Sequence, residues 1–108
     1  MKVLIWNLIA VAALSAAQGK HTFVGIITDE MCAKADHSRM RMGPTDAECT
    51  VACVNDHGVA YVLYDGRDTY KLSDERIPEQ FAGKKVRVTG TLNVKTKTIR
   101  VDPMRAAR

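Results

Sequence analysis

Apolar and polar residues alternate along most of the chain after residue 20, in short segments that are typical of a β-rich fold. These segments are rich in β-branched and aromatic residues, or they repeat with a period of two, which is the pattern of half-buried strands. Asp65-Gly66 between two of them is a strong hairpin signal. Five strands are therefore predicted: residues 22–28, 60–64, 69–72, 85–92 and 98–101.

A short helix is predicted between the first two strands. Thr45 and Glu48 are three residues apart and form a capping box, in which a hydroxyl and a carboxylate satisfy the first backbone N–H groups of a helix. We expect the helix to continue to about His57 and to end at Gly58, because glycine adopts a left-handed C-cap at least cost. Residues 29–44 are polar without periodicity, which indicates a loop.

Three smaller features complete the predicted elements. Gly25 interrupts the first strand, which indicates a bulge or a point of close packing. Residues 73–83 predict one helical turn that plugs an end of the sheet. Pro103 is expected to end the last strand, and the tail from Met104 is expected to fray.

The order of these elements predicts a mainly β fold. Five short strands with a small helical element before the fourth are typical of a small five-stranded barrel of the OB type, here with the short helix inserted between strands 1 and 2. The alternative is an α+β arrangement, in which one helix packs on an antiparallel sheet.

The N-terminus predicts an export signal. Lys2 is followed by an apolar run, and small residues at Ser15 and Ala17 suit signal peptidase, which places cleavage before Gln18. A cut after Gly19 is the second choice. The alternative is a permanent membrane anchor, but the apolar stretch is shorter than the roughly 20 residues that cross a bilayer. We therefore expect residues 1–17 to be a signal peptide and residues 18–108 to be a single exported domain, periplasmic or secreted, without a membrane span.

Three cysteines and one histidine form the main candidate site. Cys49 and Cys53 are four residues apart on the predicted helix, so both thiols share one face. Cys32 and His37 lie in the preceding loop, which can fold over that face. Three thiolates and an imidazole make a complete tetrahedral set for zinc.

Three methionines lie close to the same residues in the sequence. Met31 precedes Cys32, while Met40 and Met42 follow His37. Thioethers combined with thiolates select cuprous copper, which makes copper the second candidate metal. The simpler interpretation, which we favour, is that these methionines pad the loop against the barrel.

Export favours a disulfide over a metal, because oxidising compartments convert paired thiols to disulfides. Cys32 bonded to Cys49 or to Cys53 would fasten the loop to the helix. A bond between Cys49 and Cys53 is the least favourable, since side chains four apart on a helix rarely meet disulfide torsions. Any single bond leaves one cysteine unpaired, which points to a partner, a reactive thiol or a metal.

Other signals argue against catalysis and against nucleic-acid binding. Asp29, Glu30 and Asp36 are expected to be solvated loop carboxylates, since no partner nucleophile or phosphate-binding loop accompanies them. The chain has only six aromatic residues including Trp6, and a barrel needs most of the others in its interior. The basic residues between positions 84 and 108 are expected to lie on a solvated face.

The residues also carry a resemblance. Asp29-Glu-Met-Cys32, then His37, Cys49 and Cys53, a Gly-Val-Ala-Tyr-Val-Leu-Tyr-Asp-Gly hairpin and a late Val-Thr-Gly-Thr together resemble a family of small exported bacterial proteins without an assigned function. The resemblance spans most of residues 18–108. It implies that the cysteine and histidine elements belong to one site, and it implies no activity.

The sequence thus predicts a non-enzymatic exported protein that binds an unidentified protein or small ligand of the cell envelope. In the leading interpretation, its Cys/His insertion is stapled by a disulfide. The alternatives are a soft-metal binder for copper or zinc that uses three cysteines and one histidine, and a thiol-redox protein. The oligomeric state is left open.

Overall fold

The computed structural model describes residues 20–107. In chain order, the elements are β1 (His21–Asp29), the 3₁₀ turn η1 (Glu30–Cys32), α2 (Asp46–His57), β2 (Tyr61–Tyr64), β3 (Thr69–Leu72), α3 (Arg76–Glu79), β4 (Lys85–Asn93) and β5 (Thr98–Ala106). The predicted signal peptide lies outside the described residues. Within residues 20–107, no helix has the length and apolar character that crossing a bilayer requires.

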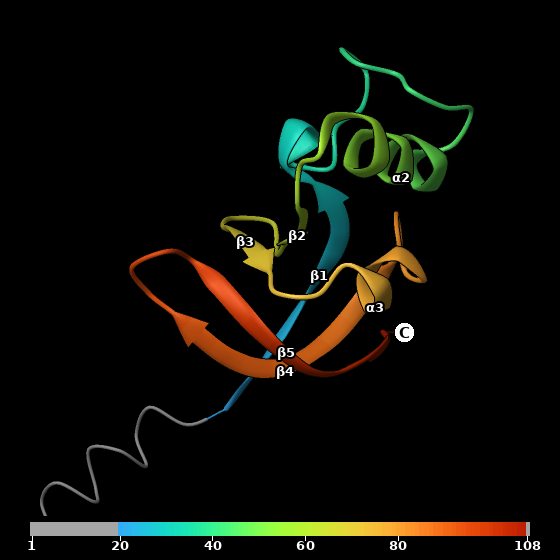
Figure 1. The fold of residues 1–108 in the computed structure, drawn as a ribbon. Helices are drawn as coiled ribbons and strands as arrows, with labels where there is room; N and C mark the ends of the chain where they lie inside the picture. The colour runs from blue at the N-terminus through green and yellow to red at the C-terminus, as the bar shows by residue number, and fades with distance from the viewer. Residues whose placement is uncertain (1–19, 108) are drawn as a thin grey trace, which may run out of the picture.

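The five strands form one sheet in the order β1-β2-β3-β5-β4, and β1 pairs with β4 as well as with β2, so the sheet closes into a small barrel (Figure 1). Neighbouring strands are antiparallel except β3 and β5, which are parallel. The main helix, α2, lies between β1 and β2 in the chain. The predicted mainly β, OB-like class with an inserted helix is confirmed. The predicted alternative, a sheet with one packed helix, also describes this structure.

Apolar residues that alternate along the strands fill the barrel interior. In β4, Lys85 and Arg87 are exposed while the valines that follow each of them are buried. Burial of one such side chain contributes about 1.5–3 kcal/mol. Five side chains from four strands are fully shielded from solvent: Ile27, Leu63, Val86, Val88 and Ile99.

Gly25 is a point of close packing, as predicted. A Cβ atom at this position would lie 2.4 Å from the carbonyl oxygen of Tyr64, on the neighbouring strand β2. Any side chain would therefore push β1 and β2 apart, and only glycine lets the two strands approach at this point.

The last strand is longer than the sequence suggested. β5 continues through Pro103, which was expected to end it, to Ala106. The register against β4 shifts between Val88 and Gly90, which pair with Met104 and Val101. A bulge of this kind accommodates proline, which has no N–H to donate to the ladder. The tail from Met104 is therefore paired with β4 and does not fray.

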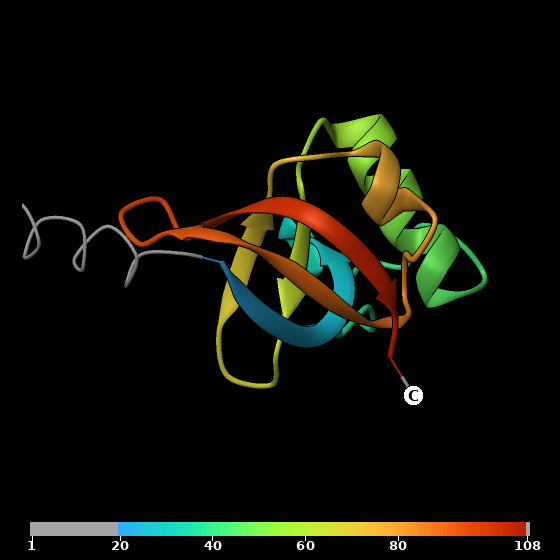
Figure 2. The same cartoon turned by 90° about the horizontal axis from the view of Figure 1, so that it is seen from below.

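The insertion and α3 cover one end of the barrel. Val54 of α2 belongs to the same buried cluster as Ile27 and Leu63. Seen from below, α2 and α3 lie together at one end of the molecule, while the β4–β5 hairpin extends from the other end (Figure 2). The predicted helical turn within residues 73–83 is present as α3. The barrel thus gives the insertion a rigid base.

Candidate metal centre

The loop after β1 folds back over α2 and brings together three of the four predicted ligands. One ligand atom from each of Cys32, His37 and Cys49 lies within 4.8 Å of the other two. All three residues are buried, with exposed fractions of 6%, 3% and 0%. Residues that are 17 positions apart in sequence thus converge in a site shielded from solvent.

Cys32 is fixed by a polar cap at the end of β1. The Oδ1 atom of Asp29 accepts hydrogen bonds from the backbone N–H groups of Met31 and Cys32, both at 3.0 Å. The hydroxyl of Thr28 donates to the carbonyl oxygen of Cys32 at 2.8 Å. These contacts wind residues 30–32 into the η1 turn, which places the Cys32 thiol over the barrel end.

Cys49 is fixed by the helix N-cap at Thr45, which forms one half of the predicted capping box. The Thr45 hydroxyl oxygen accepts from the backbone N–H of Glu48 at 3.1 Å and lies 3.2 Å from the Glu48 carboxylate. The helix ends at Gly58 in the left-handed conformation, with φ of 66°. Helix start and end are thus both as predicted, and Cys49 lies in the first turn, on the face toward the loop.

The sulfur of Cys49 is the centre of the site. It lies 3.2 Å from Nδ1 of His37. The backbone N–H of Met42 donates to it at 3.3 Å, and it donates to the carbonyl oxygen of Met40 at 3.3 Å. The loop therefore wraps around this one sulfur with its main chain as well as with His37.

Four buried side-chain polar atoms of the described residues have no hydrogen-bond partner. They are Nε2 of His37, Oδ2 of Asp29, Oγ1 of Thr50 and the hydroxyl oxygen of Tyr61. An unsatisfied buried polar group costs about 1–3 kcal/mol. Only His37 among these residues belongs to the converging group, so these atoms do not by themselves mark a ligand site.

Cys53 is buried but does not belong to the converging group, although the sequence placed it among the four ligands. Burial, followed by the charge of Asp29 and by the other two thiols, raises its pKa to about 12. Burial, the charge of Asp29 and Cys49 raise the pKa of Cys32 to about 11. Both thiols therefore keep their protons at neutral pH while no cation replaces them.

The structure contains no disulfide at the predicted positions. Cys32, Cys49 and Cys53 are all free. The expected staple is therefore absent, and the sulfur of Cys49 instead contacts His37 and the backbone of the loop.

Two of the three methionines do not pad the barrel as expected. Met31 and Met40 are 41% and 37% exposed, whereas Met42 is half-buried. Met40 and Met42 contact the sulfur of Cys49 through their main-chain atoms. The padding prediction is therefore wrong for Met31 and Met40 and stays a prediction for Met42.

The three acidic residues that were expected to be solvated, Asp29, Glu30 and Asp36, differ in burial and in their contacts. Asp29 was expected to be solvated, but it is 0% exposed and caps η1. Glu30 accepts from the backbone N–H of Ala60 at 2.7 Å, and Asp36 is exposed. Sequence reasoning thus missed the role of Asp29. The signal for it was an aspartate directly after a strand, a residue that commonly caps the turn that follows.

Fold and site together define a small closed β-barrel whose inserted loop and helix carry a buried Cys₂His group. In a comparison with known families, residues 56–107 match a model described as "Protein of unknown function (DUF5818)". No curated protein and no solved structure matches the chain. The match covers somewhat less than half of the chain, starts after Cys53 and includes none of the converging residues. It is consistent with an uncharacterised family and brings no activity with it.

Proposed function

We propose that this protein binds a thiophilic transition-metal ion through Cys32, His37 and Cys49. The observation that carries the proposal is the convergence of the three ligand atoms within 4.8 Å in a buried site. Two thiolates and an imidazole are a common donor set for such ions.

The spacing of the ligand atoms suits a metal ion after a small adjustment. Tetrahedral zinc, with bonds of about 2.0–2.3 Å, holds its ligand atoms about 3.5–3.8 Å apart. Nδ1 of His37 and the sulfur of Cys49 are 3.2 Å apart and would have to separate slightly. The widest pair would have to approach by about 1 Å to reach bonding geometry, a movement that the loop can supply.

Charge favours a divalent ion. Zinc with two thiolates and a neutral imidazole makes a neutral centre, whereas cuprous copper with the same ligands leaves one negative charge. That charge would be buried near the Asp29 carboxylate, which already disfavours ionised Cys32. Buried uncompensated charge is costly. We therefore propose zinc as the first ligand of this site.

Cuprous copper is the second candidate, because two observations favour it. Three protein ligands converge instead of four, and the side chains of Met31 and Met40 are exposed beside Cys32 and the Cys49 loop. Thioethers bind soft Cu(I) and not zinc. A copper site would therefore depend on these methionines.

The thiol-redox alternative gains no support. A nucleophilic cysteine needs a pKa below the ordinary value. The pKa values of Cys32 and Cys53 are instead raised to about 11 and about 12.

We also propose that the protein is exported. Cleavage before Gln18 would leave every described element intact, because β1 begins at His21. N-terminal sequencing of the protein from a periplasmic fraction tests this step. A start at Gln18 supports it, and an intact Met1 contradicts it.

The metal proposal is tested by native mass spectrometry of the purified protein after incubation with Zn²⁺ or with Cu(I), followed by removal of free ion. We expect one ion per chain. Cys49→Ser, Cys32→Ser and His37→Ala should each weaken binding by about a hundredfold or more, in line with loss of a metal ligand.

Two matched variants serve as controls. His57→Ala removes an exposed imidazole from the end of the same helix and should leave affinity unchanged. Cys53→Ser tests the fourth predicted ligand, and we expect a change much smaller than that of Cys49→Ser. Equal binding by wild type and Cys49→Ser would contradict the proposed site.

A further inference from the structure

A groove runs between α2 and the segment around α3, on the opposite side of α2 from the metal centre. Its volume is about 570 Å³. Small apolar residues of both segments form its floor: Ala47, Val51, Ala52 and Ala82. An apolar groove of this kind exposes surface that a partner can cover.

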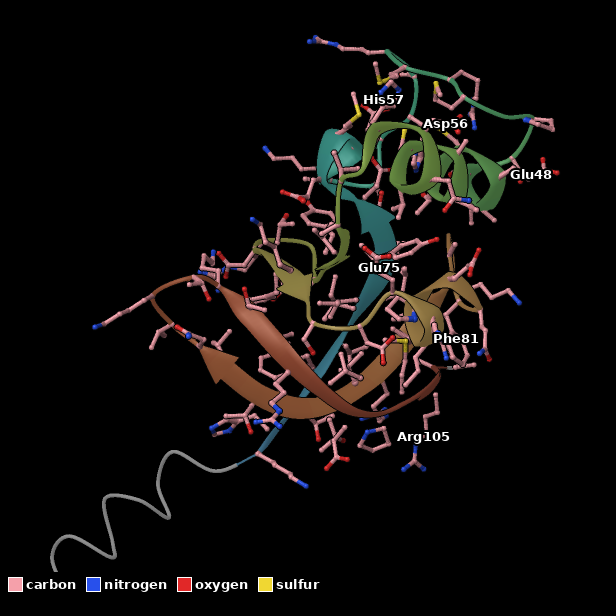
Figure 3. All side chains as sticks on the ribbon, in the orientation of Figure 1. Glu48, Asp56, His57, Glu75, Phe81 and Arg105 are labelled. Carbon is pink, nitrogen blue, oxygen red and sulfur yellow. The ribbon has the colours of Figure 1, made fainter. Side chains whose placement is uncertain are left out.

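The rim of the groove is acidic. Glu48 and Asp56 of α2, whose positions Figure 3 shows, and Glu79 of α3 line it, against the single cation Lys84. Among residues 20–107, no ion pair involves Glu48, Asp56 or Glu79. The groove therefore suits an apolar side chain that is flanked by cations.

The tip of the β4–β5 hairpin has this chemistry. Val94 is 78% exposed, more than the other large exposed apolar residues, Ile26, Met31 and Met40. Lys95 and Lys97 follow it closely. Lys97 is engaged with Asp68 at 3.4 Å and lies over the ring of Tyr70, whereas no ion pair within the described residues involves Lys95.

The tip is also held in one conformation. Oδ1 of Asn93 accepts from the backbone N–H groups of Lys95 at 3.0 Å and of Thr96 at 3.3 Å. A preordered loop loses little conformational freedom on binding. Val94 is thus displayed on a rigid support and not on a loose turn.

The β4–β5 hairpin lies at the opposite end of the molecule from α2 and α3 (Figures 1 and 2), whose residues line the groove. The tip therefore cannot fill the groove of its own chain. We propose that the hairpin tip of one copy docks into the α2–α3 groove of a second copy, with Val94 on the apolar floor and Lys95 at the acidic rim. This inference is independent of the metal site.

The size of the contact argues for two such contacts in each assembly. A hairpin tip is smaller than the roughly 800 Å² per partner of a standard interface. Two copies in antiparallel orientation can each insert a tip into the groove of the other, which doubles the buried area and closes the assembly as a dimer.

Sedimentation velocity of the full chain over a range of concentrations tests the proposal, with a chelator present so that metal plays no part. We expect a monomer–dimer equilibrium in the wild type. Lys95→Glu and Glu79→Lys should each raise the dimer dissociation constant about tenfold or more, because like charges would then face each other. Val94→Ser should have an effect of similar size.

The double variant with both charge reversals in one chain provides the decisive comparison, because it restores opposite charges across the contact. It should recover most of the wild-type dimer. Arg87→Glu is the matched control for Lys95→Glu, since it makes the same change of net charge at an exposed position in the middle of β4. A monomeric wild type at every concentration would overturn the proposal. So would single reversals that act no more strongly than Arg87→Glu, or a double variant without recovery.

Discussion

The barrel and the insertion are held together by different forces. The barrel depends on repeated burial of apolar side chains, such as Ile27 and Ile99, which belong to one buried cluster. The insertion depends on polar contacts that gather around one sulfur, that of Cys49, and on the Asp29 cap. Unpartnered buried polar atoms occur in both regions, at Tyr61 in the barrel and at His37 in the insertion. The difference lies in the converging ligand atoms of Cys32, His37 and Cys49, which the insertion carries and a metal ion could hold together.

The largest effect on stability is expected from a substitution in the barrel core. Ile27→Ala should lower the free energy of unfolding by about 2–5 kcal/mol, because it leaves a cavity in a fully buried position. Chemical denaturation followed by circular dichroism measures it. Ile26→Ala, the exposed neighbour, is the control and should change stability by less than about 1 kcal/mol. Equal losses of stability in Ile27→Ala and Ile26→Ala would show that the Ile27 side chain is not the buried one of the two.

A metal ion should act mainly on the insertion. At a free zinc concentration a hundred times the dissociation constant, binding stabilises the folded state against unfolding by about 2.7 kcal/mol. Hydrogen exchange should then slow for backbone amides of residues 30–49 that exchange through local opening, whereas amides of β2–β5 should slow only where they exchange through global unfolding. Unchanged exchange through local opening in residues 30–49 would contradict a metal that acts on the insertion.

The metal-free protein should lose stability in alkaline solution. Folding raises the pKa of Cys32 from its ordinary 9.0 to about 11, so the folded state holds the thiol proton more tightly than the unfolded state. This contribution is fully present below about pH 9 and is lost as the pH rises through about 11. It amounts to at most about 2–3 kcal/mol.

Urea unfolding at a series of pH values measures this effect, with Cys32→Ser as the comparison. The variant should show a shallower decline of stability above pH 9, because it lacks the titrating thiol. Identical pH profiles would mean that Cys32 is not buried beside Asp29.

A smaller effect is expected at the start of α2. Thr45→Ala removes the hydroxyl that caps the helix and should cost about 1 kcal/mol. Because this cap also sets the position of Cys49, metal affinity should fall as well, by about tenfold or less. Thr91→Ala, at an exposed strand position, should alter neither quantity. A loss of stability without any loss of metal affinity would show that the Thr45 cap does not set the position of Cys49 in the metal site.

Much of the fold could be predicted from the sequence, because its signals are local. The alternation in β4 and the N-cap at Thr45 each depend on neighbouring residues, and both are present. The extension of β5 through Pro103 could not be predicted, because it depends on a bulge opposite β4. The η1 turn was missed because its signal is a single aspartate, Asp29.

The candidate site was predicted only in part. The positions of Cys49 and Cys53 on one helix suggested equal roles, but the path of the loop selects Cys49 and leaves Cys53 apart. That path depends on main-chain contacts from Met40 and Met42, which carry no residue-specific signal. The choice between a disulfide and free thiols likewise depends on distances that spacing along the chain does not determine.

X-ray absorption at the zinc edge of the reconstituted protein tests the central claim most directly. We expect an ion with two sulfur ligands at about 2.3 Å and at least one imidazole nitrogen at about 2.0–2.1 Å. In Cys49→Ser, one of the two sulfurs should be lost. A shell of only oxygen and nitrogen in the wild type, or an unchanged sulfur shell in Cys49→Ser, would contradict the site formed by Cys32, His37 and Cys49.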